Sequence, residues 1–180
     1  MNLTRRCVRR GVVALGAATL LGTALSAPAW AFAPVGAPVG GFGSNDFGDA
    51  ATGARLALCS NQFSGRVTVD NGTGNGGEAG IDAFSFNCDS GVSVSPALPW
   101  TLKLDSSAAL TIEGVDLNLA TPQGTCHYTG ALQGARSFDG VYSIGGALDR
   151  RTSGCQGPSR LGFNALAENV FTTDGAPLNP

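Results

Sequence analysis

The sequence is poor in charged and aromatic side chains, and its basic residues are unevenly placed. Charged residues make up 13% and aromatic residues 7% of the 180 positions. Lysine occurs once, at Lys103, and histidine once, at His127. Four of the 11 basic residues lie within the first ten positions, which leaves seven basic against 13 acidic residues in the remainder, a net charge of −6. This acidic remainder argues against a nucleic-acid partner and against anionic membrane surfaces.

Several motifs that would indicate a known chemistry are also missing. After Cys7, the closest two cysteines are 29 residues apart, so the chain has no C-x2-C pair of the kind that zinc sites use. It has no G-x-S-x-G element for a serine nucleophile and no Gly-Lys-Ser/Thr phosphate loop. No window keeps a helical period, which disfavours a helical fold.

The first 31 residues have the pattern of an export signal. Arginines at positions 5, 6, 9 and 10 precede the apolar run Val12–Leu25, which is too short to span a bilayer comfortably. Ala29-Trp30-Ala31 fits the small-x-small rule, so we expect cleavage before Phe32 and no membrane span afterwards. The alternative is an uncleaved anchor.

The route of export stays open. Thr4-Arg5-Arg6-Cys7-Val8-Arg9 resembles the twin-arginine signature, but the usual bulky pair after the arginines is absent, so the general secretory route fits equally well. Cys7 lies before the apolar run and not after a lipobox, which argues against lipid attachment.

Residues 32–54 are dense in glycine and proline, with Ala-Pro-Val-Gly repeated in tandem. Because such a segment is a poor strand or helix former, we predict a flexible lead, with a partner-binding tail as the alternative. The predicted folded domain is 55–175, and 176–180 is a tail.

The most regular stretch of the chain is 98–119. Leu98, Trp100, Leu102 and Leu104 alternate with polar residues or proline, which is typical of a strand with one buried face. A second run follows a turn, and its apolar parity changes near Gly114. These residues predict an antiparallel pair of strands with a β-bulge at Gly114.

Similar short runs recur about every ten residues, separated by Gly, Asn and Asp. Early examples are Leu56–Cys59, Arg66–Val69 and Ile81–Cys88; the last places Phe84, Phe86 and Cys88 on one face and Ile81 and Ala83 on the other. We therefore predict an all-β antiparallel meander of nine or ten strands, forming a sandwich or a barrel.

The four cysteines after Cys7 predict two disulfides in an exported chain. Loop entropy does not distinguish the three possible pairings. Neighbouring strands of a meander are close in sequence, so we predict the local pairs Cys59–Cys88 and Cys126–Cys155.

The order of these landmarks resembles a group of secreted four-cysteine proteins of actinobacteria. The matching features are the leader, LALCS, a Gly-rich connection, DAFSFNC, LPWTL and the late cysteines, over about residues 55–172, with Leu98-Pro99-Trp100 the most specific part. The resemblance implies secretion and a β-rich fold. It carries over no activity and no site residue.

Two groups of residues are candidates for catalysis. His127 would need a carboxylate, Asp139 or Asp149, and a serine that no motif locates. Glu113 and Asp116 flank the predicted bulge and, with Asp82 and Asp105, could form a carboxylate pair for glycoside chemistry. A packed histidine and exposed acids on the outer faces of strands explain the same residues without catalysis, so we assign no catalytic residue.

Two further features have a functional and a structural interpretation. The loop 70–78 offers oxygen atoms to Ca²⁺ but lacks the acidic spacing of known calcium loops, which favours a hairpin tip. Trp100 could stack on a sugar, but it shares its parity with three leucines, which favours the core. We therefore expect no metal and no cofactor.

The favoured function is a secreted or cell-envelope protein without enzymatic activity, in a binding or structural role toward an envelope glycan or protein. The export signal and the missing catalytic motifs support it. Two alternatives stay open. One is an extracellular hydrolase that uses carboxylates or His127, and the other is a secreted protease inhibitor.

Overall fold

The chain folds into antiparallel strands. The computed structural model describes residues 34–70, 77–89, 91–105, 109–136 and 141–172, and these contain no helix. The strands are β1 (Pro38–Asp49), β2 (Arg55–Asp70), β3 (Gly77–Cys88), β4 (Ser93–Pro96), β5 (Trp100–Leu104), β6 (Ala109–Thr121), β7 (Gly124–Arg136), β8 (Tyr142–Arg150) and β9 (Arg160–Thr172).

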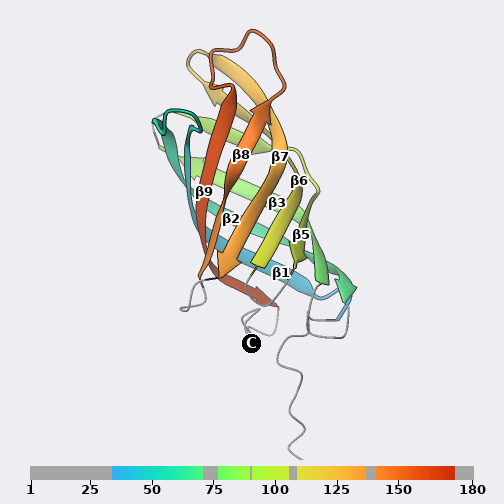
Figure 1. Ribbon diagram of the computed structural model, residues 1–180. Coiled ribbons are helices and arrows are strands. Elements are labelled where there is room, and N and C mark those ends of the chain that lie inside the picture. The colour runs from blue at the N-terminus through green and yellow to red at the C-terminus, as the bar shows by residue number, and fades with distance from the viewer. Residues whose placement is uncertain (1–33, 71–76, 90, 106–108, 137–140, 173–180) are drawn as a thin grey trace, which may run out of the picture.

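Eight of these strands close into a barrel. Neighbours pair in the order β6-β5-β3-β2-β1-β9-β8-β7, and β7 pairs again with β6. Among the described residues, the remaining strand, β4, pairs only with the second half of β6. Figure 1 shows β6 to β9 lying across β1, β2 and β3. The all-β meander is confirmed, and the choice between sandwich and barrel is settled as a barrel.

Alternation along each strand builds the core inside the barrel. In β2 the odd-numbered positions from Ala57 to Val67 are buried, whereas the even-numbered positions from Leu58 to Thr68 are exposed. Successive side chains of a strand point to opposite faces, so one face lines the interior. The largest fully buried side chains there are Trp100, Tyr128 and Phe47, each at most 1% exposed.

The predicted pair of strands at 98–119 is present as β5 and β6. Thr101 pairs with Glu113 and Leu104 with Leu110. The predicted bulge is also present, because Ile112 faces Leu132 on β7 whereas Val115 faces Gly130, and Gly114 has a φ of +68°. The extra residue moves the buried parity from even to odd positions and keeps both halves of β6 apolar toward the interior.

A second bulge corrects the prediction for β3. Ile81 and Phe84 were expected on opposite faces, but both pack against the core. The register changes there, since Ala83 pairs with Ser64 whereas Ile81 pairs with Gly65. Asp82 is the extra, exposed residue. One inserted residue turns all later side chains over, so the parity rule fails beyond it.

The predicted flexible lead at 32–54 is wrong for most of its length. β1 occupies Pro38–Asp49 and closes the barrel between β2 and β9. Pro38 is the first residue of the strand, where a missing N–H is tolerated. A Cβ at Gly43 would overlap the carbonyl oxygen of Leu166, so glycine here permits close backbone approach. β2 likewise runs unbroken through the two strands predicted at 56–59 and 66–69.

Both predicted disulfides are present. Cys59–Cys88 joins paired positions of β2 and β3, and Cys126–Cys155 joins β7 to the connection between β8 and β9. These bonds indicate folding in an oxidising compartment. Residues 1–33 and 71–76 lie outside the described residues, so the signal peptide and the hairpin tip stay predictions. Within the described chain, no helix has the length and apolarity of a membrane span.

The connection after β8 lies at one end of the barrel (Figure 1). The Tyr128 hydroxyl donates to the Pro158 carbonyl at 3.0 Å, and Arg150 Nη1 donates to the Gly157 carbonyl at 2.6 Å. Burial raises the pKa of Tyr128. Cys155 therefore anchors a segment that is also held by side chains from inside the barrel.

The close contact between β1 and β9 can be tested with a pair of glycine variants. Gly43→Ala should lower the free energy of unfolding by about 3 kcal/mol, because its Cβ meets backbone that has little freedom to move. At Gly80 the nearest atom to an added Cβ is Thr68 Cγ2, at 3.6 Å. Gly80→Ala should therefore leave stability unchanged or raise it by up to about 1 kcal/mol. Denaturant unfolding with the disulfides intact measures both free energies. A Gly43→Ala protein that is as stable as the Gly80→Ala protein would contradict the close packing of β1.

Candidate functional site

The single histidine forms a side-chain hydrogen bond on the outside of the barrel. His127 Nε2 on β7 lies 2.7 Å from Asp116 Oδ1 on β6, and the two side chains are 35% and 36% exposed. Of the two carboxylates predicted for His127, the one that the structure describes, Asp149, is not its partner. Asp149 instead accepts from Arg160 Nε at 3.2 Å, and Asp139 lies outside the described residues. Asp116 and His127 meet because β6 and β7 are neighbouring strands, and their separation along the sequence gave no indication of this contact.

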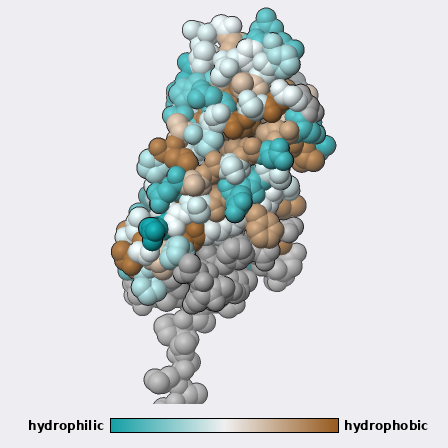
Figure 2. Space-filling view, turned by 180° about the vertical axis from the view of Figure 1, so that it is seen from behind, coloured by the Kyte–Doolittle hydropathy of each residue, from teal (hydrophilic) through white to brown (hydrophobic). Residues whose placement is uncertain are grey.

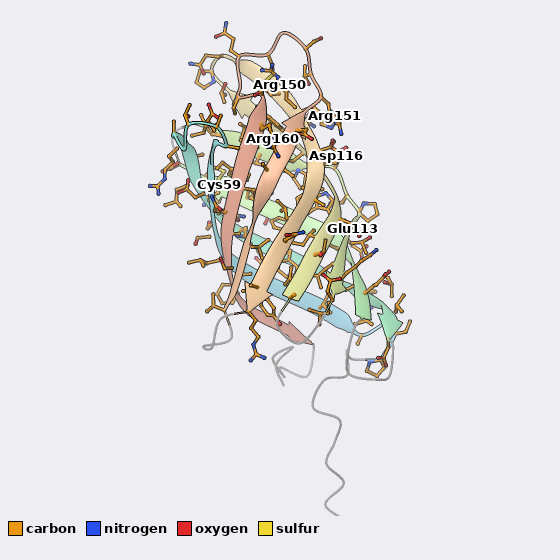
Figure 3. The ribbon with its side chains drawn as sticks, in the orientation of Figure 1. Cys59, Glu113, Asp116, Arg150, Arg151 and Arg160 are labelled. Carbon is orange, nitrogen blue, oxygen red and sulfur yellow. A yellow bond between two sulfur atoms is a disulfide. The ribbon has the colours of Figure 1, made fainter. Side chains whose placement is uncertain are left out.

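Backbone contacts hold this histidine against the connection after β8. The His127 N–H donates to Thr152 Oγ1 at 3.0 Å, and the His127 carbonyl accepts from the Arg151 N–H at 2.8 Å. Figure 3 shows Arg150, Arg151 and Arg160 near one end of the barrel and Asp116 close by. Among the described side chains, no serine hydroxyl is hydrogen-bonded to the imidazole. In the described part of the chain, the arrangement therefore supplies two members of a hydrolytic triad, a histidine and a carboxylate.

The predicted carboxylate pair is divided between two basic partners. Glu113 Oε2 lies 2.7 Å from Lys103 Nζ, whereas Asp116 contacts His127. The hydrogen bond from Lys103 to Glu113 raises the pKa of the lysine. Asp105 accepts from Thr111 Oγ1 at 2.6 Å, and Asp82 lies in its bulge on β3. In the described part of the chain, no three His, Cys, Asp or Glu side chains are grouped to hold a metal ion.

A polar cleft of about 400 Å³ lies where β1 turns into β2, beside β9. Arg55 Nη2 contacts Asp46 Oδ2 at 2.6 Å on its wall. Asp49 accepts hydrogen bonds from the backbone N–H groups of Ala51 and Thr52, which lowers the pKa of its carboxyl. Sequence reasoning missed this cleft, because it lies in the segment predicted as a flexible lead. The charged side chains of the cleft already have partners within the turn, since Arg55 contacts Asp46 and Asp49 accepts from the Ala51 N–H.

Trp100 lies in the core, as its parity predicted. The side chain is 1% exposed, and its indole N–H donates to the Ala97 carbonyl at 2.9 Å. This hydrogen bond joins the first residue of β5 to the residue just before the Leu98-Pro99-Trp100 motif.

At this motif the pairing of the barrel wall is interrupted. β3 pairs with β5 from Gly77–Leu104 to Ile81–Trp100 and no further. The next residue of the β5 side is Pro99, which has no N–H to donate, and Pro96 in β4 lacks one too. Across the described residues, the second half of β3 is paired on one side only, with β2. β4 is turned to β6 instead.

Apolar side chains flank this interruption on β3 and on either side of β4 along the chain, and we name this region the β3–β4 seam. Its members are core-contacting but only partly buried, and they are Phe84, Phe86, Cys88, Val92 and Leu98. The rings of Phe84 and Phe86 stack at a centroid distance of 4.6 Å. Phe84 also lies 5.0 Å from Trp100, and Phe86 lies 5.5 Å from Phe47. The seam is thus continuous with the aromatic core.

The outer surface around the barrel is otherwise mixed. On the face opposite to that of Figure 1, apolar atoms appear between hydrophilic ones (Figure 2). Isolated apolar side chains such as Leu58 and Leu166, 44% and 51% exposed, are ordinary on a protein surface. The seam differs from them because its side chains also contact the interior.

The fold and this site define a disulfide-linked antiparallel barrel with an apolar interruption in its wall. A protein-family model described as alkane oxidation protein activator PraA/PraB-like matches residues 1–145, from the N-terminus into β8. The chain belongs to this family. Neither the curated proteins nor the solved structures gave a match. The family match says nothing about an actinobacterial source or about the Leu-Pro-Trp motif, which stay predictions.

A pair of phenylalanine variants should separate the seam from the core. Phe47 is fully buried, so Phe47→Ala should cost about 3–5 kcal/mol of folding free energy. Phe86 is only partly buried, and Phe86→Ala should cost about 1–2 kcal/mol. Thermal and denaturant unfolding measure both. A loss for Phe86→Ala as large as that for Phe47→Ala would mean that the seam is ordinary core.

Proposed function

We propose that this protein is exported and acts without catalysis as an accessory protein that activates alkane oxidation by other proteins. The family match over residues 1–145 carries this proposal, because the family is described as activating the oxidation. The arginine-rich leader and the two disulfides support export to the cell envelope or the medium.

The physical setting of alkane oxidation makes such a helper useful. Alkanes leave water for any apolar surface, because each methylene gains about 0.8 kcal/mol on transfer. A cell therefore meets them as a separate phase, from which they must be delivered to the oxidising proteins. A small acidic barrel with a disulfide-held wall is soluble and durable in that setting.

The proposal predicts that added protein accelerates oxidation by living cells. Alkane-oxidising bacteria that lack this protein receive purified protein with hexadecane, and oxygen uptake is recorded. Uptake should rise with dose to a plateau, whereas uptake with the soluble substrate succinate should not change. Protein that has been reduced and alkylated should lose the effect, because it lacks both disulfides. An unchanged rate on hexadecane contradicts the proposal, as does an equal rise on succinate.

A hydrolase is the second candidate, and the 2.7 Å contact between His127 and Asp116 favours it. In a triad the carboxylate orients the imidazole that accepts the nucleophile's proton. We expect nitrophenyl ester hydrolysis to stay at background in the wild type. Hydrolysis that is lost in both His127→Ala and Asp116→Asn would replace the accessory role by an enzymatic one.

A further inference from the structure

We propose that the β3–β4 seam binds a linear alkyl chain, which enters between the two strands and lies against Phe84 and Phe86. The choice of ligand rests on the proposed function. The choice of place rests on the structure alone, on three observations: the missing backbone pairing, the lining, and the contact with the aromatic core.

Because β3 and β4 are not paired in the described residues, this part of the wall opens with the smallest loss of backbone hydrogen bonds. Separating two paired strands would break a row of backbone hydrogen bonds and leave their groups unsatisfied. No such pairing joins β3 to β4 in the described chain. Pro96 and Pro99 have no N–H that could be left without a partner. Only side-chain contacts must be exchanged, and an alkyl chain restores contacts of the same kind.

The lining selects for hydrocarbon. Phe84, Phe86, Val92 and Leu98 carry no hydrogen-bonding side-chain group, and the Cys59–Cys88 disulfide holds the end of the seam at Cys88. An alkyl chain against these side chains therefore has no polar side-chain group to desolvate, whereas a sugar or a peptide would lose its own hydrogen bonds to water there. Affinity should rise with chain length, by about twofold to fourfold for each added methylene.

The aromatic contacts provide a built-in reporter. Trp100 lies 5.0 Å from Phe84, so a ligand against Phe84 comes close to the indole. The other tryptophan of the chain is Trp30. In a full-length Trp30→Phe protein, fluorescence therefore reports Trp100 alone, and a heavy atom carried by the ligand quenches it at short range.

The test is a titration of that protein with bromohexane, bromooctane and bromodecane, each brominated at one end. We expect saturable quenching, tighter binding with each longer chain, and reversal by unbrominated decane. Bromoethanol at the same concentrations should leave the fluorescence unchanged. Absence of saturable quenching, or quenching that decane does not reverse, overturns the proposal.

Two matched leucine variants locate the site. Leu98→Ser removes an apolar side chain from the seam and should weaken binding by about fivefold to tenfold. Leu166→Ser removes the same side chain from the outside of β9, where it is 51% exposed, and should change affinity by less than about twofold. If both variants weaken binding equally, the seam is not the binding site. If Leu98→Ser does not fold, as judged by near-ultraviolet circular dichroism, the chain-length series decides alone.

The failure of this inference is distinguishable from the failure of the proposed function. Stimulated hexadecane oxidation without quenching of Trp100 would keep the accessory role and remove the seam as its site. Saturable quenching without stimulation would keep the alkyl-binding seam and remove the activation of alkane oxidation.

Discussion

The missing N–H groups of Pro96 and Pro99 are the constraint on which the rest of this structure depends. The pairing between β3 and β5 ends at Ile81 and Trp100, next to Pro99, and in the described residues β4 pairs with β6 and not with β3. An all-backbone wall would have enclosed the aromatic core completely. Here the core reaches partly exposed positions at Phe84 and Phe86, next to a disulfide that limits how far β3 departs from β2.

Much of the fold follows from local rules, and the exceptions have physical causes. Period-two alternation predicts β5 and β6, and the parity change predicts the bulge at Gly114, because glycine is the residue that accepts its φ of +68°. The same rules miss β1, since glycines that serve close packing look like glycines of a loop. They also misplace Phe84, because the bulge at Asp82 uses an ordinary residue and has no signal in the sequence.

The site was less accessible to sequence reasoning than the fold. His127, Glu113 and Asp116 are the residues a chemist singles out, and the barrel places each on its outer face, with Glu113 beside Lys103 and His127 beside Asp116. Partners across strands depend on register, which the sequence does not state. The seam consists of residues that look like core. Only the two prolines three positions apart indicated that pairing would fail there, and of these Pro99 lies in the Leu-Pro-Trp motif and Pro96 just before it.

Amide hydrogen exchange along β3 tests the account most directly. The Asp89 N–H donates to the Leu58 carbonyl, and hydrogen-bonded positions alternate along an antiparallel pair, so Ser85 and Asn87 donate toward β2 whereas the amides of Phe84 and Phe86 point toward β4. The account predicts slow exchange at Ser85 and Asn87 and fast exchange at Phe84 and Phe86. Uniform protection from 83 to 88 would mean that β3 and β4 are paired, and it would contradict the seam.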